Sequence, residues 1–166
     1  MDSKLADAQA AHETTLSAML AALSGANIIY GLGMLEMGMT IDYAKLVMDN
    51  EFASMIKRVV SGIAVNQESL AVEVIKQVGA CGEFVSHEHT YNHFKSEQSK
   101  SKLIDRRSAA DWLAMGGKDL TERANDVAKD LYMNYVPEPL PDDVQKKLRN
   151  IVNEAERHYN VAISKE

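Results

Sequence analysis

Three of the five histidines lie close together, at positions 87, 89 and 93. His89 and His93 are four residues apart, so a helix would place their imidazole rings on one face. With His87 or Glu88 as a third ligand, such a pair has the chemistry of a zinc site. The chain has no His-Glu-x-x-His motif, however, and we expect no bound metal. A metal-free contact with substrate, shared with Tyr91, and a structural role at a helix N-terminus near a cleft are the other interpretations.

A second candidate site follows an apolar stretch near the N-terminus. Gly31-Leu32-Gly33 resembles the start of a dinucleotide-binding fingerprint, but Glu36 stands where its third glycine would be. In α/β enzymes, loops at the C-terminal ends of parallel strands carry the functional groups. Tyr30 and Glu36 are therefore candidates for lining a pocket. The alternative is that these residues only form a turn.

These candidates need elements to position them, and the first half of the chain predicts three. Apolar residues at intervals of three or four predict helices over about 5–23 and 41–61, the second capped by Thr40. The segment 27–30, Asn-Ile-Ile-Tyr, predicts a buried strand between them. A solitary buried strand needs neighbours that pair with its backbone. We therefore expect an α/β, helix-rich fold in which this strand is one of several.

The middle of the chain predicts shorter elements. Asn66 is expected to cap a single helix that ends at Gly79, and 82–86 could form a second strand. Ser86 would then cap a short helix containing the histidines. The stretch 82–86 is too short for its sequence to establish a strand.

The last third is expected to be helical and highly charged. Asp119 and Glu122 have the spacing of a capping box, which predicts a helix through about residue 135. The three prolines, at 137, 139 and 141, predict an extended connector, and Pro141 is well placed to open a final helix. We expect a single domain overall, with a helix, a strand and further helices over 1–136, the part that the resemblance described below implies to be a partial barrel, and a connector plus C-terminal helix over 137–166.

Composition excludes several classes of function. The net charge of −6 argues against nucleic-acid binding, which requires clustered Lys and Arg. Cys81 is the single cysteine, so no internal disulfide can form, and no signal-peptide pattern is present. Both observations favour a cytoplasmic protein. The uncharged stretch 14–35 is long enough to span a bilayer, but glycines and an asparagine interrupt it, so we expect no membrane span.

Short motifs along most of the chain resemble the C-terminal part of the trimethylamine methyltransferase family, whose members are corrinoid-dependent. Each motif is weak alone, and their order and spacing carry the resemblance. The matching pieces are Asp2-Ser3-Lys4, Asp7-Ala8-Gln9-Ala10 with Glu13, Leu23-Ser24-Gly25-Ala26-Asn27, Asp49-Asn50-Glu51, Gly62-Ile63, Gly79 with Gly82 and Phe84, His89-Thr90, Asp105-Arg106, Trp112 and Gly116.

The resemblance implies the C-terminal part of a TIM-type (β/α)8 barrel, incomplete on its own because the chain is about a third of the usual length. It also implies a methyltransferase that moves a methyl group from trimethylamine, or a related methylated amine, to a corrinoid protein in methylotrophic methanogenesis. The cobalamin-type corrinoid would be carried by that partner protein and not by this chain. Other expected partners are the N-terminal remainder of the enzyme and the small amine, while self-association into a homo-oligomer is left open.

Family members that act on trimethylamine contain pyrrolysine, encoded by an in-frame amber codon close to the stretch that matches the start of this chain. We therefore expect this sequence to be the piece downstream of such a codon. The rival interpretation is a non-enzymatic helical module that binds a partner protein.

For an alkylammonium substrate, residue chemistry suggests roles for the candidates. The ring of Tyr30 or Tyr91 could offer a cation–π contact, and Glu36 or Glu88 could balance the positive charge. His87 and His89 complete the set of expected substrate contacts. No residue is assigned as catalytic.

Overall fold

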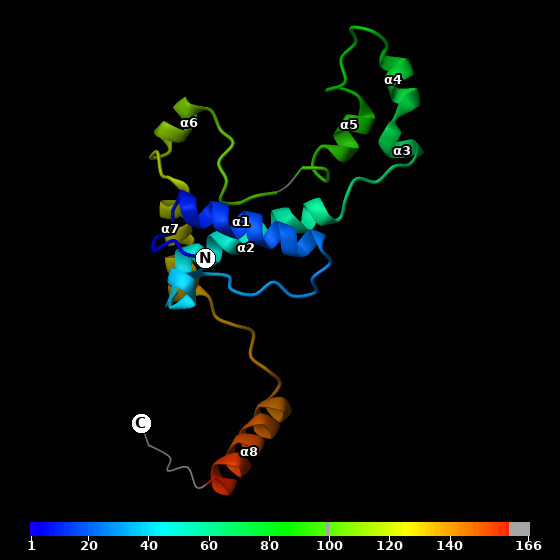
Figure 1. Ribbon diagram of the computed structural model, residues 1–166. Coiled ribbons are helices and arrows are strands. Elements are labelled where there is room, and N and C mark those ends of the chain that lie inside the picture. Colours follow the sequence, from blue (N-terminus) through cyan, green and yellow to red (C-terminus); the bar gives the residue numbers. More distant parts are fainter. Residues whose placement is uncertain (99, 160–166) are drawn as a thin grey trace. The chain divides into compact units, whose positions relative to one another are not determined.

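The computed structural model describes residues 1–98 and 100–159. The chain divides into two units, Met1–Tyr132 and Met133–Glu166, and each is described here by itself. Residues 160–166, which end the predicted C-terminal element, lie outside the described residues. The expectation of a helix-rich fold is confirmed (Figure 1).

Two long helices pack against each other in the first unit (Figure 1). The helix α1 spans Ala8–Leu23, and the carboxylate of Asp7 caps it by accepting a hydrogen bond from the Ala10 amide at 3.0 Å. The helix α2 spans Tyr43–Val60, and its cap is Asp42, which accepts from the Lys45 amide at 2.7 Å. Thr40 was the wrong cap because it is paired in a strand, so the helix begins two residues later than expected.

A small core forms where α2 meets more distant parts of the chain. Ala44, Met48 and Phe52 of α2 are buried together with Leu103 and with Ala124 of α7, which spans Leu120–Asn134. Hydrogen bonds hold these segments in place: the Thr121 hydroxyl donates to the Ala6 carbonyl at 2.6 Å, and the Arg123 guanidinium donates to the Leu103 carbonyl at 2.9 Å. The core therefore joins the N-terminal segment, α2 and α7.

The predicted strand at 27–30 is not formed. The segment is irregular, and Ile28 and Tyr30 are 83% and 85% exposed. Among the described residues no strand pairs with this backbone, and without a neighbour a strand cannot satisfy its amides and carbonyls. The described sheet is instead an antiparallel pair, β1 (Met34–Leu35) and β2 (Thr40–Ile41), joined by the 3-10 turn η1 (Glu36–Gly38). The expected parallel arrangement is absent from the described residues.

The middle segment is helical but more broken than expected. Asn66 does cap a helix, yet Ala71 adopts a left-handed conformation and splits the run into α3 (Gln67–Leu70) and α4 (Val72–Val78). The second predicted strand, at 82–86, is not formed: the segment begins as irregular backbone and ends in a turn, in which the His87 amide donates to the Phe84 carbonyl at 3.1 Å.

Two short helices lie between α4 and α7. The histidine helix α5 spans Glu88–His93, and His87 caps it in place of the expected Ser86. A short helix α6 spans Ala109–Ala114. The capping box before α7 is confirmed: the Asp119 amide donates to Glu122 and the Glu122 amide donates to Asp119, both at 2.8 Å.

In the second unit the proline-containing segment is extended, and Pro141 immediately precedes α8, which spans Asp142–His158. The start of the final helix at Pro141 is therefore confirmed. Of the helices in the described part of the chain, none combines the length and the apolar character that crossing a bilayer requires.

Candidate functional site

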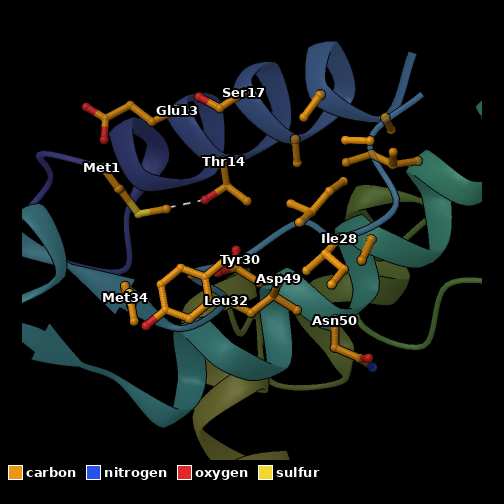
Figure 2. Close-up of a pocket in the computed structure, with 18 of the residues that line it drawn as sticks. Met1, Glu13, Thr14, Ser17, Ile28, Tyr30, Leu32, Met34, Asp49 and Asn50 are labelled. Atoms are coloured by element: carbon orange, nitrogen blue, oxygen red, sulfur yellow. Dashed lines mark hydrogen bonds between the residues drawn. The ribbon is translucent and has the colours of Figure 1, made fainter. Parts of the chain in front are cut away.

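An open groove of about 1380 Å³ lies between α1, α2 and the irregular segment after α1 (Figure 2). Its walls are largely apolar. Ala18 and Ala21 contribute from α1, Ile56 contributes from α2, and Ile28 and Tyr30 contribute from the connecting segment. Because this groove also includes Tyr30, one of the predicted contacts, it is where we place the candidate site.

A buried ion pair reaches this groove from α2. The side chains of Lys45 and Asp49 are fully buried, lie one helical turn apart and are in direct contact. The Lys45 ammonium also donates to the Thr14 hydroxyl of α1 at 2.7 Å. The second oxygen of Asp49 accepts from the Gly33 amide at 2.8 Å. The pair therefore ties α1, α2 and the loop that carries Tyr30 into one arrangement.

The loop at Gly33 is held too closely to accept a side chain. A Cβ on this residue would lie 2.9 Å from the Cβ of Leu46, and the backbone φ is +76°. Glycine adopts such a φ at little cost, whereas other residues are strained there. Gly33 thus allows the loop to lie directly on α2 and present its amide to Asp49.

The first residues of the chain are fastened at the end of the groove. The Glu13 carboxylate accepts from the Asp2 amide and from the Gln9 side-chain amide, both at 2.7 Å. The Gln9 bond first and the Asp2 bond second lower the pKa of Glu13. The pKa of Asp7 is also lowered, mainly because its carboxylate accepts from the Ala10 amide and then from the Ser3 hydroxyl. Both carboxylates are therefore ionised near neutral pH, as these bonds require.

Of the two predicted residues in the loop, only Tyr30 belongs to the groove (Figure 2). Glu36 lies in η1, where its carboxylate accepts from the Thr40 hydroxyl at 3.1 Å and its amide donates to the Ser3 carbonyl at 2.9 Å. Glu36 thus braces the β1–β2 hairpin against the N-terminal segment. Its expected part in substrate binding stays a prediction.

The histidine segment forms a separate cluster. His89 and His93 share one face of α5, as predicted, with ring centroids 4.4 Å apart. Both contact Glu68 of α3: the His89 Nε2 lies 2.9 Å from its backbone carbonyl oxygen, and the His93 Nε2 lies 3.2 Å from its carboxylate. The His87 Nδ1 accepts from the His89 amide at 3.1 Å, and its Nε2 lies 3.4 Å from the side-chain oxygen of Gln77. These contacts attach α5 to α3 and α4.

This geometry does not assemble a zinc site. Within the described residues no three His, Cys, Asp or Glu side chains converge on one point. His87 is engaged with the start of its own helix, and Glu88 and Tyr91 point outward, with Tyr91 73% exposed. None of the three lines the groove with Tyr30. The six predicted contacts therefore do not form one site: Tyr30 lies in the groove, Glu36 lies in η1, and the other four lie at α5. Their roles toward substrate stay predictions.

Sequence reasoning missed Lys45 and Asp49. Their spacing of four residues was visible, but on most helices such a pair is exposed and structurally minor. A usable signal was the position of Asp49 three residues before Phe52 and seven before Ile56, which places it on the apolar face of the helix. A charge in that environment implies a buried partner.

The similarity of this chain to known proteins extends over nearly its whole length. Residues 1–160 match the family model described as trimethylamine methyltransferase. The chain is 56% identical over 164 residues to trimethylamine methyltransferase MttB of Desulfitobacterium hafniense, covering 99% of this chain and 33% of the relative. It is 41% identical over 158 residues to MttB1 of Methanosarcina acetivorans, covering 95% of this chain and 32% of the relative.

A relative named for a different activity is less similar to this chain. The glycine betaine methyltransferase of Desulfitobacterium hafniense is 34% identical over 152 residues, covering 91% of this chain and 32% of the relative. The chain thus spans about a third of the length of the curated relatives it matches. The match to the family model covers nearly all of the sequence, and the chain therefore belongs to the trimethylamine methyltransferase family.

Proposed function

We propose that this chain supplies the C-terminal third of an enzyme that moves a methyl group from trimethylamine to a corrinoid protein. The observation that carries the proposal is the family match over residues 1–160, together with 56% identity to a trimethylamine methyltransferase. The weaker identity to a glycine betaine methyltransferase makes a related methylated amine the second candidate for the substrate. Relatives from Methanosarcina support methylotrophic methanogenesis as the metabolic setting. We propose that the reaction takes place in the cytoplasm.

The open groove supports the view that the rest of the enzyme completes the site. One wall of the groove carries Ile28 and Tyr30 on a backbone without a strand partner among the described residues. Burying a large apolar side chain contributes about 1.5–3 kcal/mol, so an exposed isoleucine here is a ready contact for another segment. We propose that 27–30 becomes a strand of a TIM-type barrel once the other two thirds of the enzyme are present.

In this arrangement the chain positions the amine and the corrinoid protein accepts the methyl group. The Tyr30 ring could face an alkylammonium group, since aromatic faces attract such cations. The buried Lys45–Asp49 pair would fix the loop that carries Tyr30, and orientation of this kind lowers the barrier to a bimolecular transfer. The corrinoid, when its carrier protein docks, supplies the cobalt that receives the methyl group.

We further propose that the reading frame continues upstream through an amber codon read as pyrrolysine. The share of the relatives that this chain covers, about a third, supports a longer reading frame, and the amber codon is the further step of the proposal. Sequencing the upstream DNA tests this directly. An open frame that encodes the other two thirds, interrupted by one in-frame amber codon, is the expected result. An unrelated gene at that place would remove the idea.

A chimaera tests the proposed activity. The C-terminal third of the trimethylamine methyltransferase MttB of Desulfitobacterium hafniense is replaced by this chain. Methylation of the cognate corrinoid protein is then measured with trimethylamine as donor. We expect the chimaera to transfer methyl groups and this chain alone to be inactive. Glycine betaine is tested as a second donor, and the comparison of the two transfer rates shows which methylated amine is the substrate. A well-folded chimaera that transfers nothing from either donor, or turnover by this chain alone, would contradict the proposal.

A further inference from the structure

Three methionines and a tyrosine gather at one end of the candidate groove, within the first unit. Met1, Met34 and Met37 line the groove together with Tyr30. Figure 2 shows Met1, Tyr30 and Met34 at the same end, and the Met37 amide donates to the Met1 carbonyl at 2.7 Å. The Met1 sulfur accepts a hydrogen bond from the Thr14 hydroxyl of α1 at 3.7 Å. We call Tyr30 and the three methionines the methionine end of the groove.

Two glycines leave the sulfur of Met34 uncovered. A Cβ on Gly31 or on Gly38 would lie 3.6 Å from this sulfur, and both glycines also line the groove. Their φ angles are +102° and +87°, which glycine adopts at little cost. The bond from the Gly33 amide to Asp49 holds the same loop in place. The loop therefore lies close to the Met34 sulfur without adding side chains that would cover it.

The side chains of the methionine end suit a methylated cation. An aromatic face attracts an alkylated ammonium group through its π electrons. A thioether sulfur is polarizable and only a weak acceptor, so it can contact the partly positive N-methyl groups. An unmethylated ammonium ion would lose hydrogen bonds to water that neither an aromatic ring nor a thioether replaces. This end therefore favours a cation whose N–H bonds are largely replaced by N-methyl bonds.

Carboxylates make the same part of the groove negative. Asp2 and Glu13 both belong to the lining, and Glu13 accepts its hydrogen bonds from uncharged amides of Asp2, Ser3 and Gln9. The Gln9 bond is the first cause of the lowered pKa of Glu13, and the α-ammonium group of Met1 is the last. Two carboxylates against one α-ammonium group leave an excess of negative charge at this place.

The lysines near the groove do not balance Glu13. The Lys45 ammonium is in direct contact with Asp49 and neutralises that carboxylate. Lys57 lines the groove but follows Lys45 by twelve residues, which is about 18 Å along a helix at 1.5 Å per residue. Lys4 donates to a backbone carbonyl and is not part of the lining. The Glu13 carboxylate is therefore available to balance a bound cation.

We propose that the methionine end is the subsite for the methylated ammonium group of the substrate, with Tyr30 and Met34 as specificity-determining residues and Glu13 as the counter-charge. The inference rests on the proposed function, because it names what binds at that same site. It selects trimethylamine, in its protonated form, over glycine betaine. The carboxylate of a bound betaine would be repelled by Glu13, and repulsion of this kind is an effective source of specificity.

Nuclear magnetic resonance of the full 166-residue chain, labelled with ¹³C at the methionine methyl groups, tests the proposal. Trimethylammonium chloride is the probe, tert-butanol is an uncharged probe of similar shape, and sodium chloride controls for ionic strength. We expect saturable shifts of the Met34 and Met37 methyl signals with trimethylammonium and much smaller shifts with tert-butanol. Met39 is the internal control, since it is 81% exposed and does not line the groove.

Variants at the methionine end separate the cation contacts from simple apolar packing. Tyr30→Leu should raise the dissociation constant of trimethylammonium about tenfold. Met34→Leu conserves the volume and should raise it about threefold. Neither change should alter the response to tert-butanol, which depends on apolar contact alone. The matched control Met39→Leu should leave the binding of both probes unchanged.

Glu13→Gln keeps a side-chain oxygen that can accept from the Asp2 amide but removes the charge. It should weaken the binding of trimethylammonium and strengthen the binding of glycine betaine, each by about threefold. A loss of folding would weaken both, so the opposite directions of the two changes isolate the effect of charge.

Equal shifts with trimethylammonium and tert-butanol would overturn the proposal. So would the absence of a saturable shift at Met34, or a Glu13→Gln variant that binds both cationic probes more weakly. Binding is measured without methyl transfer, so the two proposals can fail separately. An active chimaera without a shift at Met34 would remove the subsite and leave the proposed function standing, whereas saturable shifts with an inactive chimaera would do the reverse.

Discussion

The buried contact between Lys45 and Asp49 determines how the candidate groove is built. It satisfies the Thr14 hydroxyl of α1 and the Gly33 amide of the loop at once. Charges this deeply buried contribute little net stability as a pair, but removing one partner leaves the other without compensation. Loss of one partner should therefore destabilise the packing of α1, α2 and the loop together.

Asp49→Ala should destabilise the chain by about 3–5 kcal/mol, because it leaves the Lys45 ammonium buried and unpaired. The double variant Lys45→Met with Asp49→Leu should cost less than Asp49→Ala alone, because no charge is left in the interior. Urea unfolding followed by circular dichroism measures both.

The matched control is Glu73→Ala, which removes one partner of the exposed Glu73–Lys76 pair and should cost less than about 1 kcal/mol. Equal losses for Asp49→Ala and Glu73→Ala would show that the Lys45–Asp49 contact is not buried in solution.

Asp105 provides a pH-dependent test. Hydrogen bonds from Arg107 lower its pKa from 3.8 to about 2. Because the folded-state pKa is the lower one, this contact stabilises the chain fully above pH 3.8 and is lost as the pH falls toward 2. The stability difference between the unmodified chain and Asp105→Asn should therefore be largest near neutral pH and shrink through that acid range. A difference that stays constant throughout the acid titration of unfolding would contradict the assignment.

Among the secondary-structure elements, the long helices were predictable and the strands were not. Apolar spacing located α1 and α2 to within three residues, since both present a continuous face to each other. The segment 27–30 has the composition of a strand, yet strand formation depends on a neighbour that no local pattern supplies. Ala71 breaks the α3–α4 run for a similar reason, because nothing in its residue type marks a left-handed backbone.

Ile28→Lys separates the role of segment 27–30 in this chain from its role in the complete enzyme. The side chain is exposed, so the variant should unfold at nearly the same urea concentration as the unmodified chain. In the chimaera the same change should abolish methyl transfer, because a charge would then enter the interior of the barrel. Ile63→Lys is the control, since Ile63 is also exposed but does not line the groove. An active chimaera with Ile28→Lys would contradict the proposed burial.

For the chain as a whole, family membership could be read from motif order, while the site could not. Only Tyr30 of the six predicted contacts lines the groove, because the others were chosen by residue type and the groove is made by packing between distant segments. The chain spans about a third of the length of the relatives it matches. Under the proposed function, the remaining two thirds of the enzyme cover the groove and pair with segment 27–30.

The exposed apolar wall should be detectable in solution. We expect the chain to bind a hydrophobic dye at neutral pH, since large exposed apolar patches favour such binding. The chimaera should bind markedly less dye per molecule, because its added segments cover the groove. Fluorescence titration at equal concentrations makes the comparison. Equal dye binding by the chain and the chimaera would contradict the view that the groove is an uncompleted interior.

Hydrogen exchange at the amides of residues 27–30 tests the central claim most directly. In this chain alone these amides should exchange nearly as fast as in an unfolded peptide, because no strand protects them. In the chimaera with the N-terminal two thirds of the Desulfitobacterium relative, we expect exchange to slow by at least about a hundredfold, as for paired strands in a core. Equally fast exchange in a folded, active chimaera would show that this segment is not a strand of the complete enzyme.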